Sequence, residues 1–291
     1  MKLVFIIGSG RCGSTLVHEV LMRHEAFGFI SNIEDNLTWT KHFDRWNNPL
    51  YRSWLGRYTE KGKLRFAPSE AYNIIAREVS PIYANSCRDL TSADVTPWLE
   101  NRFQKFFQSC HHRQGRDMFS HKYTGWPRIG FFSSIFQEAK FINIVRDGRA
   151  VANSWLQMPW WNGYRGPDNW LWGELTEEEE ELWRESNRQF NVLAALSWKK
   201  LMYAFEKSRK LINPDQYLEI RYEDVVKNPR EAFEKILSFS DIDWTNAFNK
   251  QFVHQVFRTS RRRAFETDLT PLQLEQIERV IGSQLERYGY D

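Results

Sequence analysis

A glycine-rich segment near the N-terminus carries residues suited to holding a phosphate. It follows an apolar run at residues 3–7 and precedes a segment with helical periodicity, so we expect a strand, a tight turn and a helix. The backbone N–H groups of such a turn, together with the N-terminus of the helix, can bind an anion. Arg11 adds a cation, and Ser14 and Thr15 add hydroxyl donors. The sequence therefore predicts an anion site built from Ser9, Gly10, Arg11, Cys12, Gly13, Ser14 and Thr15.

Three classes of ligand fit this loop. Gly8, Gly10 and Gly13 match the GxGxxG pattern of dinucleotide-binding loops, and Glu34 lies near the distance expected for the acid that binds the ribose. The spacing also matches a Walker A loop, but Ser14 stands where that loop has its lysine, so ATP hydrolysis is not expected. The third ligand is a nucleotide 5′-phosphosulfate. The loop alone does not distinguish a dinucleotide from a phosphosulfate as the ligand.

A second anion site is predicted at residues 141–154. An apolar run ends at Arg146, and a helical segment follows in which Ser154 lies two turns along. At a rise of about 1.5 Å per residue, eight residues cover about 12 Å. The two side chains can therefore contact the same phosphate only if the long arginine extends toward the serine. The charge-assisted bond between arginine and phosphate suits this role.

These two segments together resemble the PAPS-dependent sulfotransferase family, in the style of its tyrosylprotein-sulfotransferase-like branch. The resemblance lies in residues 6–16, 146–151 and Ser154, and it extends to residues 221–226, Pro229 and residues 278–290. It implies a P-loop-like α/β fold in which the first loop holds the 5′-phosphosulfate and Arg146 and Ser154 hold the 3′-phosphate. It also implies transfer of a sulfuryl group from PAPS (3′-phosphoadenosine-5′-phosphosulfate) to a hydroxyl, amine or amide nitrogen of a small molecule, with PAP as product.

The resemblance further implies roles for individual residues. Lys122 is similar to an active-site lysine of that branch, and Arg11 would neutralise charge near the leaving phosphate. Glu34 is expected as the general base, and His121 is its rival. Tyr222 is expected near the adenine. A late basic run at residues 258–263 is expected to close over the 3′-phosphate through Arg261, Arg262 or Arg263, although such runs are usually solvated surface.

The pattern of apolar runs predicts one α/β domain over residues 1–291, with a parallel sheet flanked by helices. Strands are expected at residues 3–7, 27–31, 119–122, 140–145 and 217–220, and helices at 14–24, 148–156 and 271–287, with one long helix from about 176 to 210. An aromatic loop or lid is expected at residues 158–173, which hold Trp160, Trp161, Tyr164, Trp170 and Trp172.

Composition restricts the function further. The 40 basic and 37 acidic residues give a net charge of +3, which carries no general nucleic-acid signature. No apolar run approaches a membrane span, and the distant Cys12, Cys87 and Cys110 fit a reduced, cytoplasmic protein. No metal motif is present, so a metal-free reaction on a small acceptor, for example a natural product, is expected. An NAD(P)-dependent oxidoreductase and a catalytically inactive nucleotide-binding protein remain alternatives, and the oligomeric state stays open.

Overall fold

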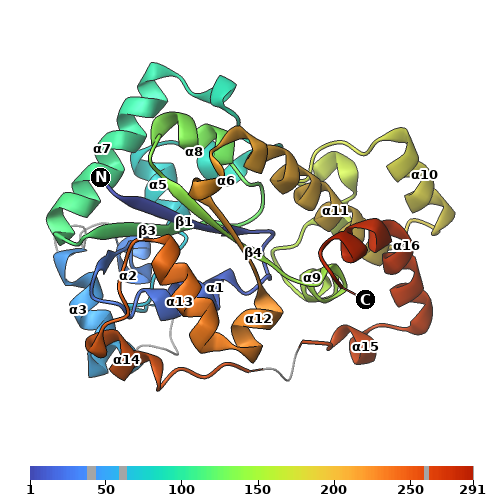
Figure 1. Cartoon of the computed structure of the whole chain (residues 1–291). Coiled ribbons are helices and arrows are strands. Elements are labelled where there is room, and N and C mark those ends of the chain that lie inside the picture. Colours follow the sequence, from blue (N-terminus) through green and yellow to red (C-terminus); the bar gives the residue numbers. More distant parts are fainter. Residues whose placement is uncertain (38–43, 59–63, 259–261, 291) are drawn as a thin grey trace.

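The computed structural model describes residues 1–37, 44–58, 64–258 and 262–290. Within them, five parallel strands form one sheet in the order β2-β3-β1-β4-β5 (Figure 1). The strands are β1 (Leu3–Gly8), β2 (Phe27–Gly28), β3 (Met118–Lys122), β4 (Lys140–Val145) and β5 (Tyr217–Arg221). The fold predicted from the sequence, a parallel sheet flanked by helices, is therefore confirmed.

The central strand β1 is buried on both faces, and its side chains alternate between two cores. Leu3, Phe5 and Ile7 face the first core, whereas Val4 and Ile6 face the second. The first core is covered by α7 (Pro97–Gln114), α8 (Ile129–Ile135), α9 (Gly148–Leu156), α11 (Phe190–Ser208) and α16 (Pro271–Arg287). The second is covered by α1 (Ser14–Leu21), α13 (Pro229–Phe239) and α14 (Asn246–Phe252).

The strand order creates a crevice at the carboxyl ends of the central strands. After β1 the chain enters α1 on one face of the sheet, and after β4 it enters α9 on the other face. Because these neighbouring connections diverge, they leave an opening between them, the place where open α/β sheets bind ligands. The register pairs Ile6 of β1 with Lys122 of β3 and with Ile142 of β4, so all three strands end at this crevice.

Two expected elements differ from the structure. The strand expected at residues 27–31 is only two residues long, Phe27–Gly28. The long helix predicted from about 176 to 210 is two helices, α10 (Glu177–Glu185) and α11. Asn187 and Arg188 separate them with φ values of 54° and 58°, which interrupt the right-handed helix. Thr176 and Glu179 form the expected capping box at the start of α10.

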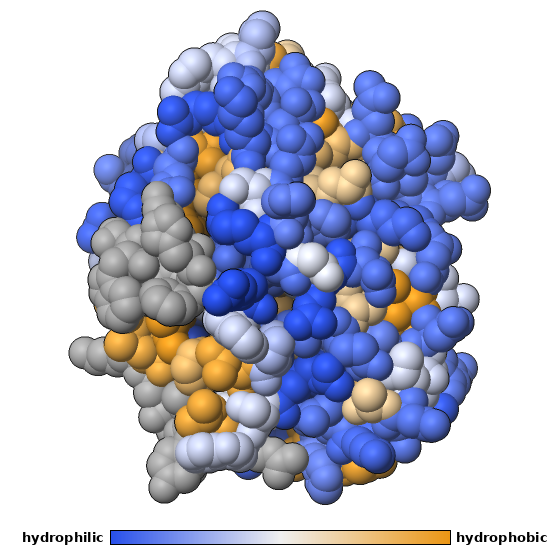
Figure 2. Space-filling view, turned by 90° about the vertical axis from the view of Figure 1, so that its left-hand side faces the viewer, coloured by the Kyte–Doolittle hydropathy of each residue, from blue (hydrophilic) through white to orange (hydrophobic). Residues whose placement is uncertain are grey.

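Shorter helices complete the chain between these elements. They are α2 (Asn32–Asn36), α3 (Asn47–Arg52), α4 (Trp54–Tyr58), α5 (Tyr72–Glu78), α6 (Ile82–Asn85), α12 (Tyr222–Lys227) and α15 (Phe265–Asp268). The side of the molecule shown in Figure 2 is mostly hydrophilic, with smaller apolar areas between the polar side chains. In the described part of the chain, no helix combines the length and apolar character needed to cross a membrane.

Candidate functional site

The loop after β1 turns through backbone conformations that shape it as a cradle. Gly10, Arg11 and Gly13 have φ values of 83°, 54° and 93°, in the left-handed region. A side chain at Gly13 would place its Cβ 2.1 Å from Cδ2 of Tyr222, so glycine is also required by packing. The first turn of α1 contains no acidic residue, so its N–H groups can accept an anion without repulsion from a carboxylate in the same turn.

This loop lines a cavity of about 660 Å³, here called the main cavity. Its loop side is formed by Ser9, Gly10, Arg11, Gly13, Ser14 and Thr15. Much of the remaining lining is aromatic and includes Tyr72, Trp126, Trp160, Trp161 and Trp172, from α5, the loop after β3 and the predicted aromatic lid. Cys12, in contrast, is buried in the second core. Its thiol therefore contributes to packing, while its neighbours form the cradle.

A second cavity of about 350 Å³ adjoins the loop on the side of α9 and α12. Arg11, Arg146, Ser154, Tyr222 and Arg258 are among its lining residues, and Arg11 and Arg146 line the main cavity as well. The two cavities therefore meet at a pair of arginines.

Hydrogen bonds join the two predicted anion sites directly. Nε of Arg11 donates to Oγ of Ser154 at 2.9 Å, and Nη1 of Arg146 donates to the carbonyl oxygen of Arg11, also at 2.9 Å. The guanidinium of Arg146 lies 4.8 Å from the ring centroid of Tyr222. Residues from three separate segments of the sequence thus come together around one space.

Lys122 lies beneath the loop at the end of β3. Its Nζ is 2.8 Å from Oγ1 of Thr15 and 2.6 Å from Oε1 of Glu70, and only 5% of its side chain is exposed. Glu70 lines the main cavity and was not predicted from the sequence. No motif marks it, because it follows an irregular, aromatic-rich stretch. It is brought to the site when Pro68 pairs with Ser31 in an isolated β-bridge.

Glu34 lies in α2 outside both cavities. It is 2% exposed, and its Oε2 accepts a hydrogen bond from Asn47 at 2.9 Å. Within the described part of the chain, its Oε1 has no hydrogen-bond partner. Burial raises the pKa of Glu34 to about 7, and the nearby Asp44 carboxylate acts in the same direction. The position does not support contact with an acceptor or with a ribose.

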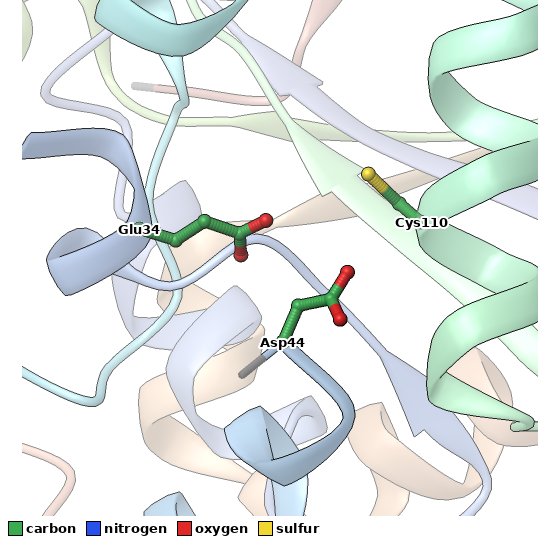
Figure 3. A group of neighbouring side chains, drawn as sticks. All are labelled: Glu34, Asp44 and Cys110. Atoms are coloured by element: carbon green, nitrogen blue, oxygen red, sulfur yellow. The ribbon is translucent and has the colours of Figure 1, made fainter. Parts of the chain in front are cut away.

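Figure 3 shows Glu34 beside Asp44 and Cys110, whose ligand atoms lie within 4.8 Å of one another. The guanidinium of Arg113 donates to Oδ2 of Asp44 at 2.6 Å and to Sγ of Cys110 at 3.6 Å. Burial raises the pKa of the Cys110 thiol above its usual range, and the positive charge of Arg113 already faces both Asp44 and Cys110. The donor set therefore fits a carboxylate pair with an arginine counter-ion better than a metal site.

His121, the rival base, is also outside both cavities. It is fully buried, its Nε2 is 2.7 Å from the hydroxyl oxygen of Tyr83, and its ring packs against Phe5 and Phe107. Burial lowers the pKa of His121 to about 3, with the Lys122 charge contributing, so the ring is neutral. Its surroundings are those of a core histidine.

The basic run is only partly placed at the site. Arg258 lines the second cavity. Arg261 lies outside the described residues. Arg262 is half-buried without lining either cavity, and Nε of the exposed Arg263 donates to Glu266 at 2.7 Å.

Comparison with known proteins places the chain in a family. A profile of the sulfotransferase family matches residues 4–246. The omega-hydroxy-beta-dihydromenaquinone-9 sulfotransferase Stf3 of Mycobacterium tuberculosis is 21% identical over 99% of this chain and 75% of its own length.

Solved structures share the fold of this chain. Sulfotransferase STF9 of Mycobacterium avium superposes with a TM-score of 0.61 at 13% identity, covering all of this chain and 77% of that one. The sulfotransferase domain of the curacin biosynthetic pathway gives 0.57 at 15% identity, covering all of this chain and 98% of that domain. The profile covers most of the sequence, and the chain therefore belongs to the sulfotransferase family.

Proposed function

We propose that this protein transfers a sulfuryl group from PAPS to a hydroxyl group of a small molecule and releases PAP. The observation that carries the proposal is the junction of two cavities at Arg11 and Arg146. A nucleotide with phosphates at both its 5′ and 3′ positions requires two anion sites joined by one nucleoside. The glycine loop is proposed to hold the 5′-phosphosulfate through its backbone N–H groups, Ser14 and Thr15.

The second cavity supports a site for the 3′-phosphate. Arg146, Ser154 and Arg258 line it, and Ser154 already accepts a hydrogen bond from a guanidinium. A phosphate placed there would receive charge-assisted hydrogen bonds from the arginines. We propose that Tyr222, which lines the same cavity, packs near the adenine, and that Arg258 takes the role expected of Arg261, Arg262 or Arg263.

The proposed reaction is an in-line displacement at sulfur. Its barrier is lowered by positioning and by charges placed where negative charge develops on the leaving phosphate. Arg11 and Lys122 can supply those charges, because Arg11 lines the main cavity and Lys122 hydrogen-bonds to Thr15 of the loop. We therefore propose that the reaction needs no metal ion.

The aromatic side of the main cavity favours a small acceptor with a flat, apolar part. Trp172 stacks on Trp155 with ring centroids 5.2 Å apart and an angle of 19°, and the indole N–H of Trp126 donates to the carbonyl oxygen of Leu171 at 2.8 Å. These contacts hold planar rings in fixed orientations at the wall. The relative Stf3 is named for an omega-hydroxy-beta-dihydromenaquinone-9 acceptor, which is consistent with sulfation of a hydroxyl group.

Two further proposals concern the cellular setting and the alternatives. The thiols of Cys12, Cys87 and Cys110 are free, which fits a reducing cytoplasm as the location. An NAD(P)-dependent oxidoreductase is disfavoured because Glu34, its expected ribose ligand, lies outside both cavities.

The test is incubation of the purified protein with PAPS and a panel of phenols, fused-ring alcohols and aliphatic alcohols. Mass spectrometry follows the formation of PAP and of the sulfated product. Acceptor-dependent PAP formation supports the proposal. Binding of PAP without turnover on any acceptor would favour an inactive nucleotide-binding protein, and binding of NAD in place of PAP would favour the oxidoreductase.

A further inference from the structure

Sulfuryl transfer to a hydroxyl group requires a residue that accepts the hydroxyl proton. Among the described residues that line the main cavity, Glu70 is the only carboxylate, and none is a histidine. Tyr72 also lines this cavity, but burial raises the pKa of its phenol above the usual range, so it remains protonated. The cavity therefore offers one carboxylate as a proton acceptor within its described lining.

The carboxylate of Glu70 is coupled to the glycine loop through a single lysine. Nζ of Lys122 lies 2.6 Å from Oε1 of Glu70 and 2.8 Å from Oγ1 of Thr15. The hydroxyl of Thr124 also donates to Oε1, at 3.4 Å. Glu70 is 27% exposed while Lys122 is 5% exposed, so the carboxylate faces the cavity and the ammonium lies behind it.

The backbone around Glu70 is held in place on both sides. The N–H of Ser69 donates to the carbonyl oxygen of Ile30 at 2.8 Å, and the Ser69 hydroxyl donates to Asp35 at 2.9 Å. The helix α5 begins two residues after Glu70, at Tyr72. A carboxylate anchored in this way keeps its orientation toward the cavity, as a catalytic group requires.

We propose that Glu70 is the catalytic base of this sulfotransferase; the assignment rests on the function proposed above. The acceptor hydroxyl gives its proton to the Glu70 carboxylate while its oxygen attacks the sulfur. The bond between sulfur and the 5′-phosphate oxygen breaks, and its electron pair leaves with PAP. Lys122 neutralises the charge that develops on that oxygen, and the proton on Glu70 passes to water when the products leave. No oxidation or reduction occurs in this step.

The central experiment compares three glutamate-to-glutamine variants in the same assay. Glu70→Gln is expected to lower kcat by about 10²- to 10⁴-fold, the usual effect of removing a proton-transfer group. Its Kd for PAP, measured by calorimetry, should stay within about twofold of the wild type, because the base acts on the acceptor. Glu138→Gln, at an exposed position before β4, is the matched control. Glu34→Gln tests the position that the sequence favoured for the base.

Two further measurements separate a base from a structural residue. A series of phenols of decreasing pKa should progressively restore turnover in Glu70→Gln, because a more acidic hydroxyl needs less help in losing its proton. Added formate should partly restore Glu70→Ala, since it supplies a small carboxylate in the vacated space. A residue that acts only through structure would show neither effect.

The outcomes distinguish the base assignment from the function itself. Normal turnover in Glu70→Gln, or a defect confined to PAP affinity, would overturn the assignment while leaving the sulfotransferase activity in place. A large loss of kcat in Glu34→Gln with none in Glu70→Gln would return the role to Glu34. A wild-type protein that neither binds PAP nor uses PAPS would overturn both proposals.

Discussion

Replacing Glu34 with glutamine is expected to change how the stability of the protein depends on pH. The Glu34 carboxyl is buried, and its pKa is raised from 4.5 to about 7. The folded protein therefore holds this proton at pH values where the unfolded chain has released it. Since stability falls with rising pH wherever the folded state binds more protons, Glu34 lowers the stability as pH rises from 4.5 to 7.

The size of this effect follows from the two pKa values. One pKa unit corresponds to about 1.4 kcal/mol, so a rise from 4.5 to about 7 sets an upper value of about 3 kcal/mol. Glutamine has the same shape and cannot ionise, so Glu34→Gln lacks this contribution at every pH. The Asp44 carboxylate and the Arg113 guanidinium face Glu34 and remain in the variant.

The assay is urea-induced unfolding of the wild type and Glu34→Gln at pH values from 4.5 to 8. The free energy of unfolding of the variant minus that of the wild type should increase across this range by up to about 3 kcal/mol. Taking the difference between the two proteins removes titrations that they share. A difference that stays constant with pH, or decreases, would refute the account of Glu34 as a buried carboxyl with a raised pKa.

Two other substitutions test the positively charged side chains of Lys122 and Arg258. Lys122→Ala should lower kcat more than it weakens PAP binding, because the interaction of the lysine with the leaving oxygen grows as that oxygen becomes charged. Wild-type turnover should survive EDTA, and a strict requirement for Mg²⁺ would contradict the proposed electrostatics. Arg258→Ala should weaken binding of PAP by about 1.5–3 kcal/mol and leave ADP affinity nearly unchanged, as calorimetry can show; equal losses for both nucleotides would remove Arg258 from the 3′-phosphate site.

Local sequence patterns predicted the sheet and the two segments proposed to hold the phosphates. The apolar runs of β1 and β4 are continuous because both strands are buried on both faces, and the glycine loop is specified by its own backbone requirements. Arg146 and Ser154 were recognisable because a strand and the helix after it fix their separation. These features depend on residues close together in the sequence.

The acceptor side was harder to predict because it depends on contacts between distant segments. Glu34 follows β2, but the chain turns into α2 there, and the carboxyl points toward Asn47 and Asp44. His121 alternates with Lys122 on β3, so the same strand that brings the lysine to the loop sends the histidine into the core. Glu70 comes to the cavity through the pairing of Pro68 with Ser31, which no local sequence pattern predicts.

The central claim, that the junction of the two cavities recognises a nucleotide with a 3′-phosphate, is tested most directly by calorimetric titration with PAP and with ADP. The two ligands share the adenosine and a 5′-phosphate, and only PAP carries the 3′-phosphate. The wild type should bind PAP more tightly than ADP by about 1.5–3 kcal/mol, roughly a 10- to 150-fold difference in Kd, and Arg146→Ala should remove most of that preference. Equal affinity of the wild type for PAP and ADP would contradict the account.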